Sequence, residues 1–174
     1  MTTHKHEDHS YDNPLIEEDV PGVKIIGGAA DNVKGCNMPI NDGDKFEIQP
    51  GLEVICLQKP CHTRGHTMYY ITDSNASEED GDIQRAVFTG DMVFVGGAGH
   101  FFEGDGQEAW TAFCAIRDLP DDTIIFSGHE YALANYKWAI TVDENNVRIQ
   151  ERLAWAETER EAGRQCHSTV GEEK

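Results

Sequence analysis

The stretch Thr3-His4-Lys5-His6-Glu7-Asp8-His9 places three imidazoles and a carboxylate within six residues of one another. His4 and His6 are two residues apart, so in an extended segment their side chains point to the same side. Asp8 and His9 follow directly, and a bend there would aim a second pair of ligands at a neighbouring point. One peptide thus offers donors to two adjacent metal ions, and imidazole with carboxylate suits zinc, iron or manganese. The alternative is a solvated, histidine-rich N-terminus or an expression tag, although a tag is more often a plain run of histidines.

The composition limits the classes of partner. The chain has 174 residues, which indicates one domain, or one domain with a small appendage. Its formal net charge is −18, from 14 Lys and Arg against 32 Asp and Glu, so it lacks the basic surface that binds nucleic acid or an anionic membrane. No stretch approaches the ~18 apolar residues of a membrane-spanning helix, and the first part of the chain is polar and acidic, unlike a signal peptide.

The cysteines point to the compartment. There are five of them, an odd number scattered along the chain, which suggests no small disulfide framework. This usage fits a reducing environment, so we expect a cytoplasmic protein. A mitochondrial location would require a targeting segment upstream of this sequence. The sequence does not identify a protein partner.

The hydrophobic pattern predicts mostly strands in the first part of the chain and helices after it. Strands are expected at 23–26, 45–58 (two strands, turning at Pro50-Gly51), 68–71, 86–88 and 123–126, and helices at 107–118, 131–140 and 145–161. The change of character lies near residue 130. This order favours an α+β layered domain over residues 1–130, followed by a helical segment over residues 131–174.

Further metal-type ligands follow or precede the predicted strands. They lie in the segments Cys61-His62-Thr63-Arg64-Gly65-His66, Thr89-Gly90-Asp91 and Gly128-His129-Glu130. Each lies in a loop beside glycine, which is where sheets of this kind place their sites. Taken singly, an Asp after Thr-Gly is most often a turn residue, and one His at a strand end is most often a hydrogen-bonded structural residue. Together with the first cluster they predict one shared metal site.

These segments, taken in order, resemble the metallo-β-lactamase fold superfamily, and within it they are most similar to glyoxalase II, the hydroxyacylglutathione hydrolases. The resemblance covers nearly the whole chain. It also includes Val87-Phe88-Thr89-Gly90-Asp91, Gly99-His100-Phe101-Phe102-Glu103-Gly104, Gly128-His129-Glu130-Tyr131 and Leu153-Ala154-Trp155-Ala156. It implies an αββα sandwich in which residues 1–130 belong to the catalytic domain and residues 131–174 to a helical substrate-binding domain.

The resemblance also implies the ligands of two divalent metal ions, expected to be zinc, with iron or manganese as alternatives. One ion would be held by His4, His6 and His62, the other by Asp8, His9 and His129, with Asp91 bridging both. Asp8 and Asp91 are the implied catalytic residues. His66 is expected to support the ligands or to be structural.

The implied reaction is thioester hydrolysis. S-(2-hydroxyacyl)glutathione, usually S-D-lactoylglutathione, reacts with water to give a 2-hydroxy acid (D-lactate) and glutathione, a step of methylglyoxal detoxification. The predicted partner is therefore a small-molecule acyl-thiol. Contacts to it are expected from His100, Phe102 and Tyr131.

The sequence departs from the family's pattern in the glutathione site and at the ends. His100 and Phe102 stand where the family usually has Lys and Tyr facing glutathione, and basic residues of a C-terminal helix are not present, so another thiol carrier remains an alternative. Several strands normally precede the histidine motif, whereas here only Met1 and Thr2 precede Thr3. We therefore expect a sandwich that lacks its N-terminal strands, and helical and catalytic domains that are both partial.

Two other functions remain open at this stage. The first is a mononuclear iron persulfide dioxygenase of the same superfamily, which needs only ligands of the His4, His62 and Asp91 type. The second is a truncated homologue that binds metal with little activity.

Overall fold

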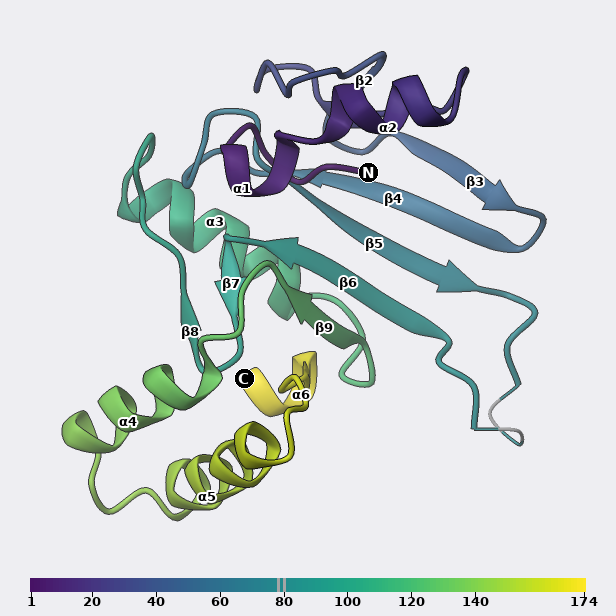
Figure 1. Ribbon diagram of the computed structural model, residues 1–174. Coiled ribbons are helices and arrows are strands. Elements are labelled where there is room, and N and C mark those ends of the chain that lie inside the picture. The colour runs from purple at the N-terminus through teal and green to yellow at the C-terminus, as the bar shows by residue number, and fades with distance from the viewer. Residues whose placement is uncertain (78, 80) are drawn as a thin grey trace.

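A six-stranded mixed sheet forms the centre of the molecule (Figure 1). The computed structural model describes residues 1–77, 79 and 81–174. The strands, in spatial order, are β10 (Ser168–Thr169), β9 (Ile124–Ser127), β6 (Arg85–Gly90), β5 (Thr67–Asp73), β4 (Leu52–Gln58) and β3 (Lys45–Gln49). Neighbours are antiparallel except β6 and β9, which run parallel. The strands predicted over 45–58 and at 68–71, 86–88 and 123–126 are therefore confirmed.

One face of this sheet is covered by helix α3 (Gly106–Arg117). The helix begins at a capping box, in which the Asp105 carboxylate accepts hydrogen bonds from the backbone N–H groups of Gln107 and Glu108. Its buried residues recur at the helical period and pack against the sheet. They are Ala109, Ala112 and Ile116, in contact with a core that includes Met68, Val87 and Ile125.

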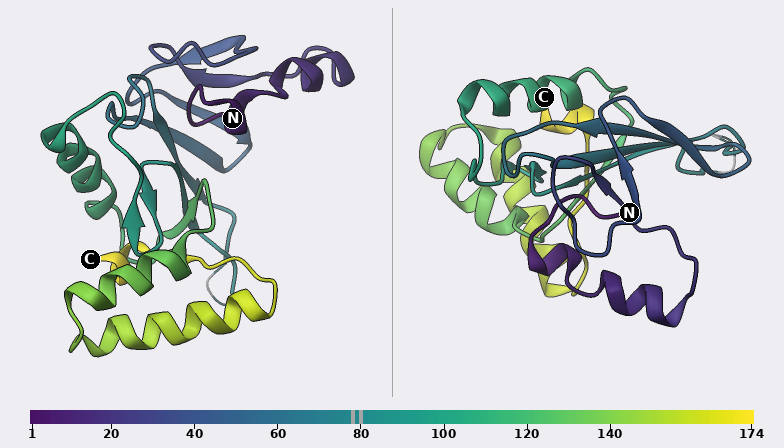
Figure 2. Two further views of the ribbon diagram at one scale, coloured as in Figure 1. Left: turned by 60° about the vertical axis from the view of Figure 1, so that its left-hand side comes forward. Right: turned by 90° about the horizontal axis from the view of Figure 1, so that it is seen from above.

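The opposite face is covered at one end by the N-terminal part of the chain (Figure 2). There β1 (Ile26–Gly28) pairs in parallel with β2 (Met38–Ile40), and their side chains pack on Val54, Cys56 and Tyr69. The sequence predicted a strand at 23–26, and this prediction was misplaced. The observed strand begins at Ile26 and continues through Gly27 and Gly28. Pairing with β2, a long-range contact, sets these bounds.

Farther along the same face, a pair of stacked phenylalanines is partly open to solvent. Phe88 of β6 lies opposite Phe126 of β9, with ring centroids 5.1 Å apart and planes 18° from parallel. Phe88 is also the register partner of Tyr69, which places both on the face that β1 and β2 cover elsewhere. Phe88 is 40% exposed.

The N-terminal segment contains short helices before β1, namely α1 (Glu7–Ser10) and α2 (Asn13–Asp19). The C-terminal part is a helical hairpin of α4 (Ala132–Val142) and α5 (Val147–Glu161), followed by β10 and by α6 (Val170–Glu173). The helices predicted at 107–118, 131–140 and 145–161 are confirmed within two residues at each end. The hairpin packs through Ala132, Tyr136 and Ala156 on Val95 and Cys166. The division into domains at residue 130 stays a prediction.

Two chemical features of the whole chain bear on the expectations from sequence. Among the described residues, no helix has both the length and the apolar character needed to cross a membrane. All five cysteines are free thiols. Cys56, Cys61 and Cys166 are buried, and burial raises the pKa of Cys56 and of Cys166 to about 11.

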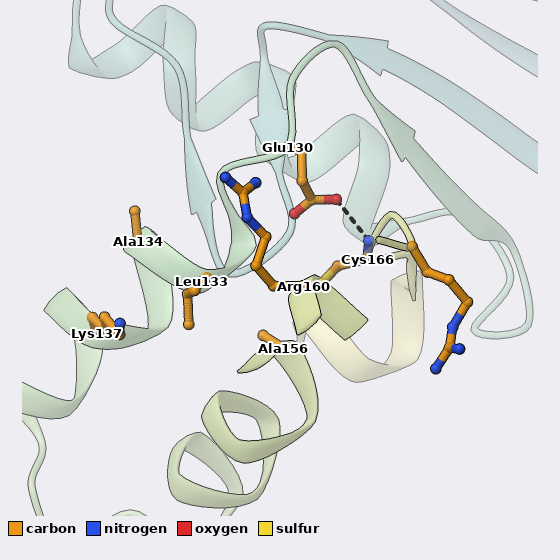
Figure 3. Close-up of a pocket in the computed structure, with 8 residues that line it drawn as sticks. Glu130, Leu133, Ala134, Lys137, Ala156, Arg160 and Cys166 are labelled. Carbon is orange, nitrogen blue, oxygen red and sulfur yellow. Dashed lines mark hydrogen bonds between the residues drawn. The ribbon is translucent and has the colours of Figure 1, made fainter. Parts of the chain in front are cut away.

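Glu130 fastens the returning C-terminal segment to the loop after β9. Its carboxylate accepts hydrogen bonds from the backbone N–H of Cys166 at 2.6 Å and from that of Ala132, at the start of α4, at 3.3 Å. Glu130 lines a cavity of about 280 Å³ between α4 and α5. Figure 3 shows its carboxylate pointing toward Cys166. Arg164, on the rim of this cavity, is already held by both carboxylate oxygens of Glu159 at 2.7 Å. Glu130 therefore ties the strand β10 and the helix α6, which follow Cys166, to the end of the sheet.

Replacement of Ile125 by alanine should lower the free energy of unfolding by about 2–5 kcal/mol, because Ile125 is fully buried between β9 and α3 and leaves a cavity. The same replacement at Ile83, which is 55% exposed, should change it by less than about 1 kcal/mol. Urea denaturation measures both values. Similar losses at the two positions would show that Ile125 does not lie in the core.

Glu130→Gln should loosen the C-terminal segment, because a glutamine has one accepting oxygen and its NH₂ group would oppose one of the two N–H groups. We expect a loss of roughly 1–3 kcal/mol in the local stability of residues 162–174, read as faster limited proteolysis there. Glu157→Gln, an exposed change on α5, is the control. Unchanged cleavage of the Glu130 variant would rule out this role.

Candidate metal centre

The predicted ligands all lie at one end of the sheet. His4 and His6 precede α1, and Asp8 and His9 are within it. His62 lies in the loop between β4 and β5, Asp91 directly follows β6, and His129 follows β9. The loop between the antiparallel strands β4 and β5 lies at the end of the sheet where β5 begins. Because β5 is antiparallel to β6 and β6 is parallel to β9, both β6 and β9 finish at that same end. The structure brings all seven side chains together in three overlapping groups whose ligand atoms lie within 4.8 Å of one another: His4, His6 and His62; His4, His9 and Asp91; and Asp8, His9 and His129.

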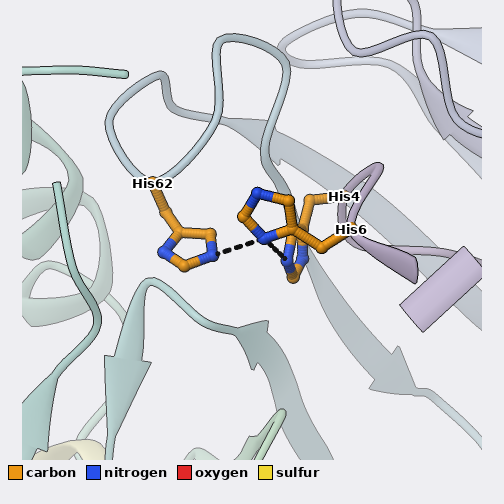
Figure 4. Close-up of side chains that lie close together, drawn as sticks. All are labelled: His4, His6 and His62. Carbon is orange, nitrogen blue, oxygen red and sulfur yellow. Dashed lines mark hydrogen bonds between the residues drawn. The ribbon is translucent and has the colours of Figure 1, made fainter. Parts of the chain in front are cut away.

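In the first group, three ring nitrogens converge on one point (Figure 4). Nε2 of His4 lies 3.0 Å from Nδ1 of His6, and Nε2 of His62 lies 3.1 Å from that same nitrogen. One nitrogen of His6 thus faces two others. A ring nitrogen of neutral imidazole has either one proton or one lone pair in the ring plane, so it can make only one of these two contacts as a good hydrogen bond. Nitrogens that share a tetrahedral zinc ion lie roughly 3.3 Å apart. The arrangement therefore fits a shared metal ion.

Asp8, His9 and His129 are called the second group here and below, and they offer mixed nitrogen and oxygen donors. Nε2 of His9 and Nε2 of His129 are 3.1 Å apart. Oδ2 of Asp8 lies 3.1 Å from Nε2 of His129 and 3.5 Å from Nε2 of His9. Asp8 is the exposed member, with 59% of its side chain accessible, whereas the His9 side chain is 12% accessible. This set is the donor type that zinc, iron and manganese accept.

Asp91 lies between the two groups. Its Oδ1 is 3.4 Å from Nε2 of His9, and its Oδ2 is 3.4 Å from Nε2 of His129 and 3.7 Å from Nε2 of His62. Oδ1 is buried and has no hydrogen-bond partner among the described residues. A buried carboxylate oxygen without a partner is costly unless a cation occupies the space before it. Glycine at position 128 allows Oδ1 of Asp91 to lie this close to the backbone, because a Cβ on residue 128 would be only 2.3 Å from that oxygen.

Neighbouring groups orient the ligand rings. Nδ1 of His62 donates to the backbone carbonyl of His100 at 2.9 Å, which leaves Nε2 as the unprotonated nitrogen toward His6. His66 is completely buried, and its ring stacks on that of His4 with centroids 5.1 Å apart. Its Nε2 accepts the backbone N–H of Asp91 at 3.2 Å. His66 thus lies beneath the cluster and touches two of its members.

Burial favours the neutral form of four of the imidazoles, those of His4, His9, His62 and His66. It lowers the pKa of His4, His9 and His62 from the ordinary value of 6.5, although the nearby Asp91 carboxylate partly opposes the shift at His9 and His62. Burial, together with the nearby His62, lowers the pKa of His66 to about 3. Neutral imidazole is the form that binds metal, so the lowered pKa values of His4, His9 and His62 favour metal binding at pH 7.

Aromatic rings line both sides of the entrance. On one side Phe102, which is 64% exposed, lies with its ring centroid 5.2 Å from that of His62 and 5.2 Å from that of His100. On the other side the Tyr131 ring stacks on His129 at 5.3 Å. The structure therefore places all three predicted substrate residues beside the ligands. Phe94, which the sequence analysis did not single out, supports the ring of Tyr131 edge-on at 5.1 Å.

The comparisons with known proteins agree with this geometry. A family model described as "Hydroxyacylglutathione hydrolase C-terminus" matches residues 130–174. A protein of Arabidopsis thaliana named "Hydroxyacylglutathione hydrolase cytoplasmic" is 42% identical over 163 residues, which cover 93% of this chain and 61% of that protein. "Hydroxyacylglutathione hydrolase" of Rhizobium meliloti (strain 1021) is 36% identical over 177 residues, which cover 100% of this chain and 64% of that protein. The chain thus spans less than two thirds of the length of either relative.

Solved structures show the same fold. ETHE1 from Myxococcus xanthus is 27% identical, with a TM-score of 0.58, over 74% of this chain and 52% of that one. BJP-1, a subclass B3 metallo-β-lactamase of Bradyrhizobium japonicum, is 14% identical with a TM-score of 0.55, over 92% of this chain and 69% of that one, and shows the fold alone. The sequence comparisons show that this chain is similar to the hydroxyacylglutathione hydrolases, and the solved structures show that it has the metallo-β-lactamase fold.

Proposed function

We propose that the chain belongs to a metal-dependent thioester hydrolase that cleaves S-(2-hydroxyacyl)glutathione, with S-D-lactoylglutathione as substrate, to a 2-hydroxy acid and glutathione. Its role would then be methylglyoxal detoxification. The observation that carries the proposal is the pair of ligand groups facing each other across Asp91, in a chain 42% identical to a protein named as such a hydrolase. The same relative is named as cytoplasmic, which supports the cytoplasm as the location.

The residues would hold two divalent ions, with zinc favoured by the donor set and iron or manganese as alternatives. His4, His6 and His62 would bind one ion, Asp8, His9 and His129 the other, and Asp91 would bridge them. Ions held there supply Lewis acidity, which polarises a carbonyl group and makes water nucleophilic near neutral pH. The dioxygenase alternative uses one iron only, and the close approach of Asp8, His9 and His129, with contacts of 3.1–3.5 Å, favours a second ion instead.

Asp8 and Asp91 have separate parts in the reaction. Asp8 is the accessible carboxylate, so it can accept a hydrogen bond from the attacking water and orient a lone pair toward the carbonyl carbon. Asp91 is largely buried and fixes the spacing of the two groups. The leaving group is a thiolate, whose conjugate acid has a pKa of ~8.5, so it departs without a strong proton donor.

The thiol carrier would lie between Phe102 and Tyr131. Both rings flank the ligands, and the Tyr131 hydroxyl offers a hydrogen bond to a peptide group. His100 lies next to Phe102 and presents a polar ring on that side. In this proposal residues 1–130 provide the catalytic domain, and residues 131–174, which contribute Tyr131 and the α4–α5 hairpin, belong to the substrate-binding helical part.

Metal titration of the chelator-treated protein should reach two ions per chain and raise the melting temperature, because metal binds the folded state preferentially. His129→Ala should reduce the count to one. His167→Ala, an exposed histidine outside the metal groups, is the control. One iron per chain in the unaltered protein would favour the dioxygenase, and no change of melting temperature with chelator would contradict metal-linked folding.

Hydrolysis of S-D-lactoylglutathione tests the reaction itself. The purified chain should catalyse it, and Asp91→Asn should reduce kcat/KM by at least about 10²-fold, since loss of the bridging charge removes several kcal/mol of transition-state stabilisation. Asp118→Asn, with its side chain 69% accessible at the end of α3, should leave the rate unchanged. Equal rates for the Asp91 variant and the unaltered chain would remove the catalytic proposal and favour a metal-binding homologue with little activity.

A further inference from the structure

We infer that Asp31 is a positioning residue that holds the two ligand-bearing loops of the first metal group in register. The inference rests on the metal-binding part of the proposed function. Asp31 follows β1 and its carboxyl side chain is completely buried, although it belongs to none of the metal groups found among the described residues. It lies 26 residues from Lys5 and 34 from Gly65 in sequence, yet contacts the backbone of both.

The two carboxylate oxygens of Asp31 are divided between the two loops. Oδ2 accepts the backbone N–H of Lys5 at 2.7 Å, and Oδ1 accepts the backbone N–H of Gly65 at 3.0 Å. Lys5 lies between the ligands His4 and His6. Gly65 lies in the loop that carries His62 and next to His66, on which His4 stacks.

No cation accounts for the burial of this carboxylate. Among the described residues, Asp31 forms no ion pair, and the ammonium of Lys5 binds Glu103 at 2.7 Å instead. A buried carboxylate loses much solvation free energy, which only strong hydrogen bonds offset. The two carboxylate oxygens accept two backbone N–H groups, whereas an asparagine at this position would offer one accepting oxygen and an NH₂ group, which cannot accept the second N–H.

The turn that contains Asp31 packs closely against the loop that contains Gly65. A Cβ atom on Gly65 would lie 2.4 Å from the backbone nitrogen of Asp31 and 2.5 Å from its Cβ. A Cβ on Gly28, just before this turn, would lie 2.1 Å from the carbonyl oxygen of Gly65. The turn and the loop thus touch backbone to backbone, and only glycine allows this approach.

The consequence concerns the first metal group specifically. Nδ1 of His6 meets Nε2 of His62 at 3.1 Å only if the two loops keep this relative position. Groups that fix ligands in this way typically change metal affinity 10–100-fold when removed. Of the second group, Asp8 and His9 lie in α1 and His129 follows β9, and the two backbone N–H groups that donate to Asp31 belong to Lys5 and Gly65, neither of which adjoins these ligands in the chain.

The test measures metal affinity for each group separately. In a His129→Ala background only the first group is intact, and in a His6→Ala background only the second. Asp31→Asn should weaken zinc binding about 10–100-fold in the first background and leave it unchanged in the second, as measured by competition with a chromophoric chelator. Asp44→Asn is the matched control, because Oδ2 of Asp44 also accepts a backbone N–H, from Asn41 at 2.8 Å, but on the surface. Equal weakening in both backgrounds, or none, would overturn the inference.

A second test needs no variant of Asp31 and combines hydrogen exchange without metal with zinc binding by two variants of Lys5. Lys5→Pro removes the N–H donor, whereas Lys5→Ala keeps it, and both lose the ion pair with Glu103. Hydrogen exchange in the metal-free chain should show slow exchange of the Lys5 and Gly65 amides in the unaltered protein. Only Lys5→Pro should weaken zinc binding at the first group beyond the effect of Lys5→Ala. Fast exchange of both amides in the unaltered protein, or equal affinities of the two variants, would contradict the role of Asp31. Failure of the unaltered chain to bind zinc while both amides are protected would count against the proposed function alone.

Discussion

Imidazoles are packed against one another at one end of the sheet, with ring nitrogens 3.0–3.1 Å apart within each group, and a buried carboxylate oxygen of Asp91 has no hydrogen-bond partner in the part of the chain that the structure describes. The buried members of this cluster lose their hydration, and for Oδ1 of Asp91 no hydrogen bond from the described residues replaces it. The cluster is stabilised once a cation is shared among the nitrogens. The strand order, the parallel pairing of β6 with β9 and the loop contacts can be understood as the framework that holds this crowded arrangement.

Glycine makes the close approach of the loops sterically possible. Gly90 has a φ of +52°, and a Cβ there would lie 2.6 Å from Oγ1 of Thr3 and 2.8 Å from Nε2 of His66. The N-terminal segment therefore lies directly on the turn that delivers Asp91. At the other side Gly128 lets the β9 turn approach the same carboxylate. Ligands from four chain segments reach one place because the turns at Gly90 and Gly128 have no side chain that would keep the segments apart.

The entrance differs in character from the buried cluster. The chain carries a formal net charge of −18, yet the partly exposed rings of Phe102 and Tyr131 contact the ligands His62 and His129. An aromatic entrance favours a substrate with apolar or peptide-like parts next to a carbonyl group. The strong acidity lies largely on the outer surface, where solvent and salt screen it from the site.

Local sequence patterns determined much of the fold and the identity of the candidate site. The alternation of apolar residues from Lys45 to Gln58 and the helical period of α3 depend on neighbours in the chain, and the spacing of His4, His6, Asp8 and His9 is a property of one peptide. Tertiary structure alone decided the start of β1, the hydrogen bonds of Asp31 and Glu130, and the support of Tyr131 by Phe94. The long-range contacts among them join residues 12 to 37 positions apart in the chain, and these contacts leave no periodic mark in the sequence.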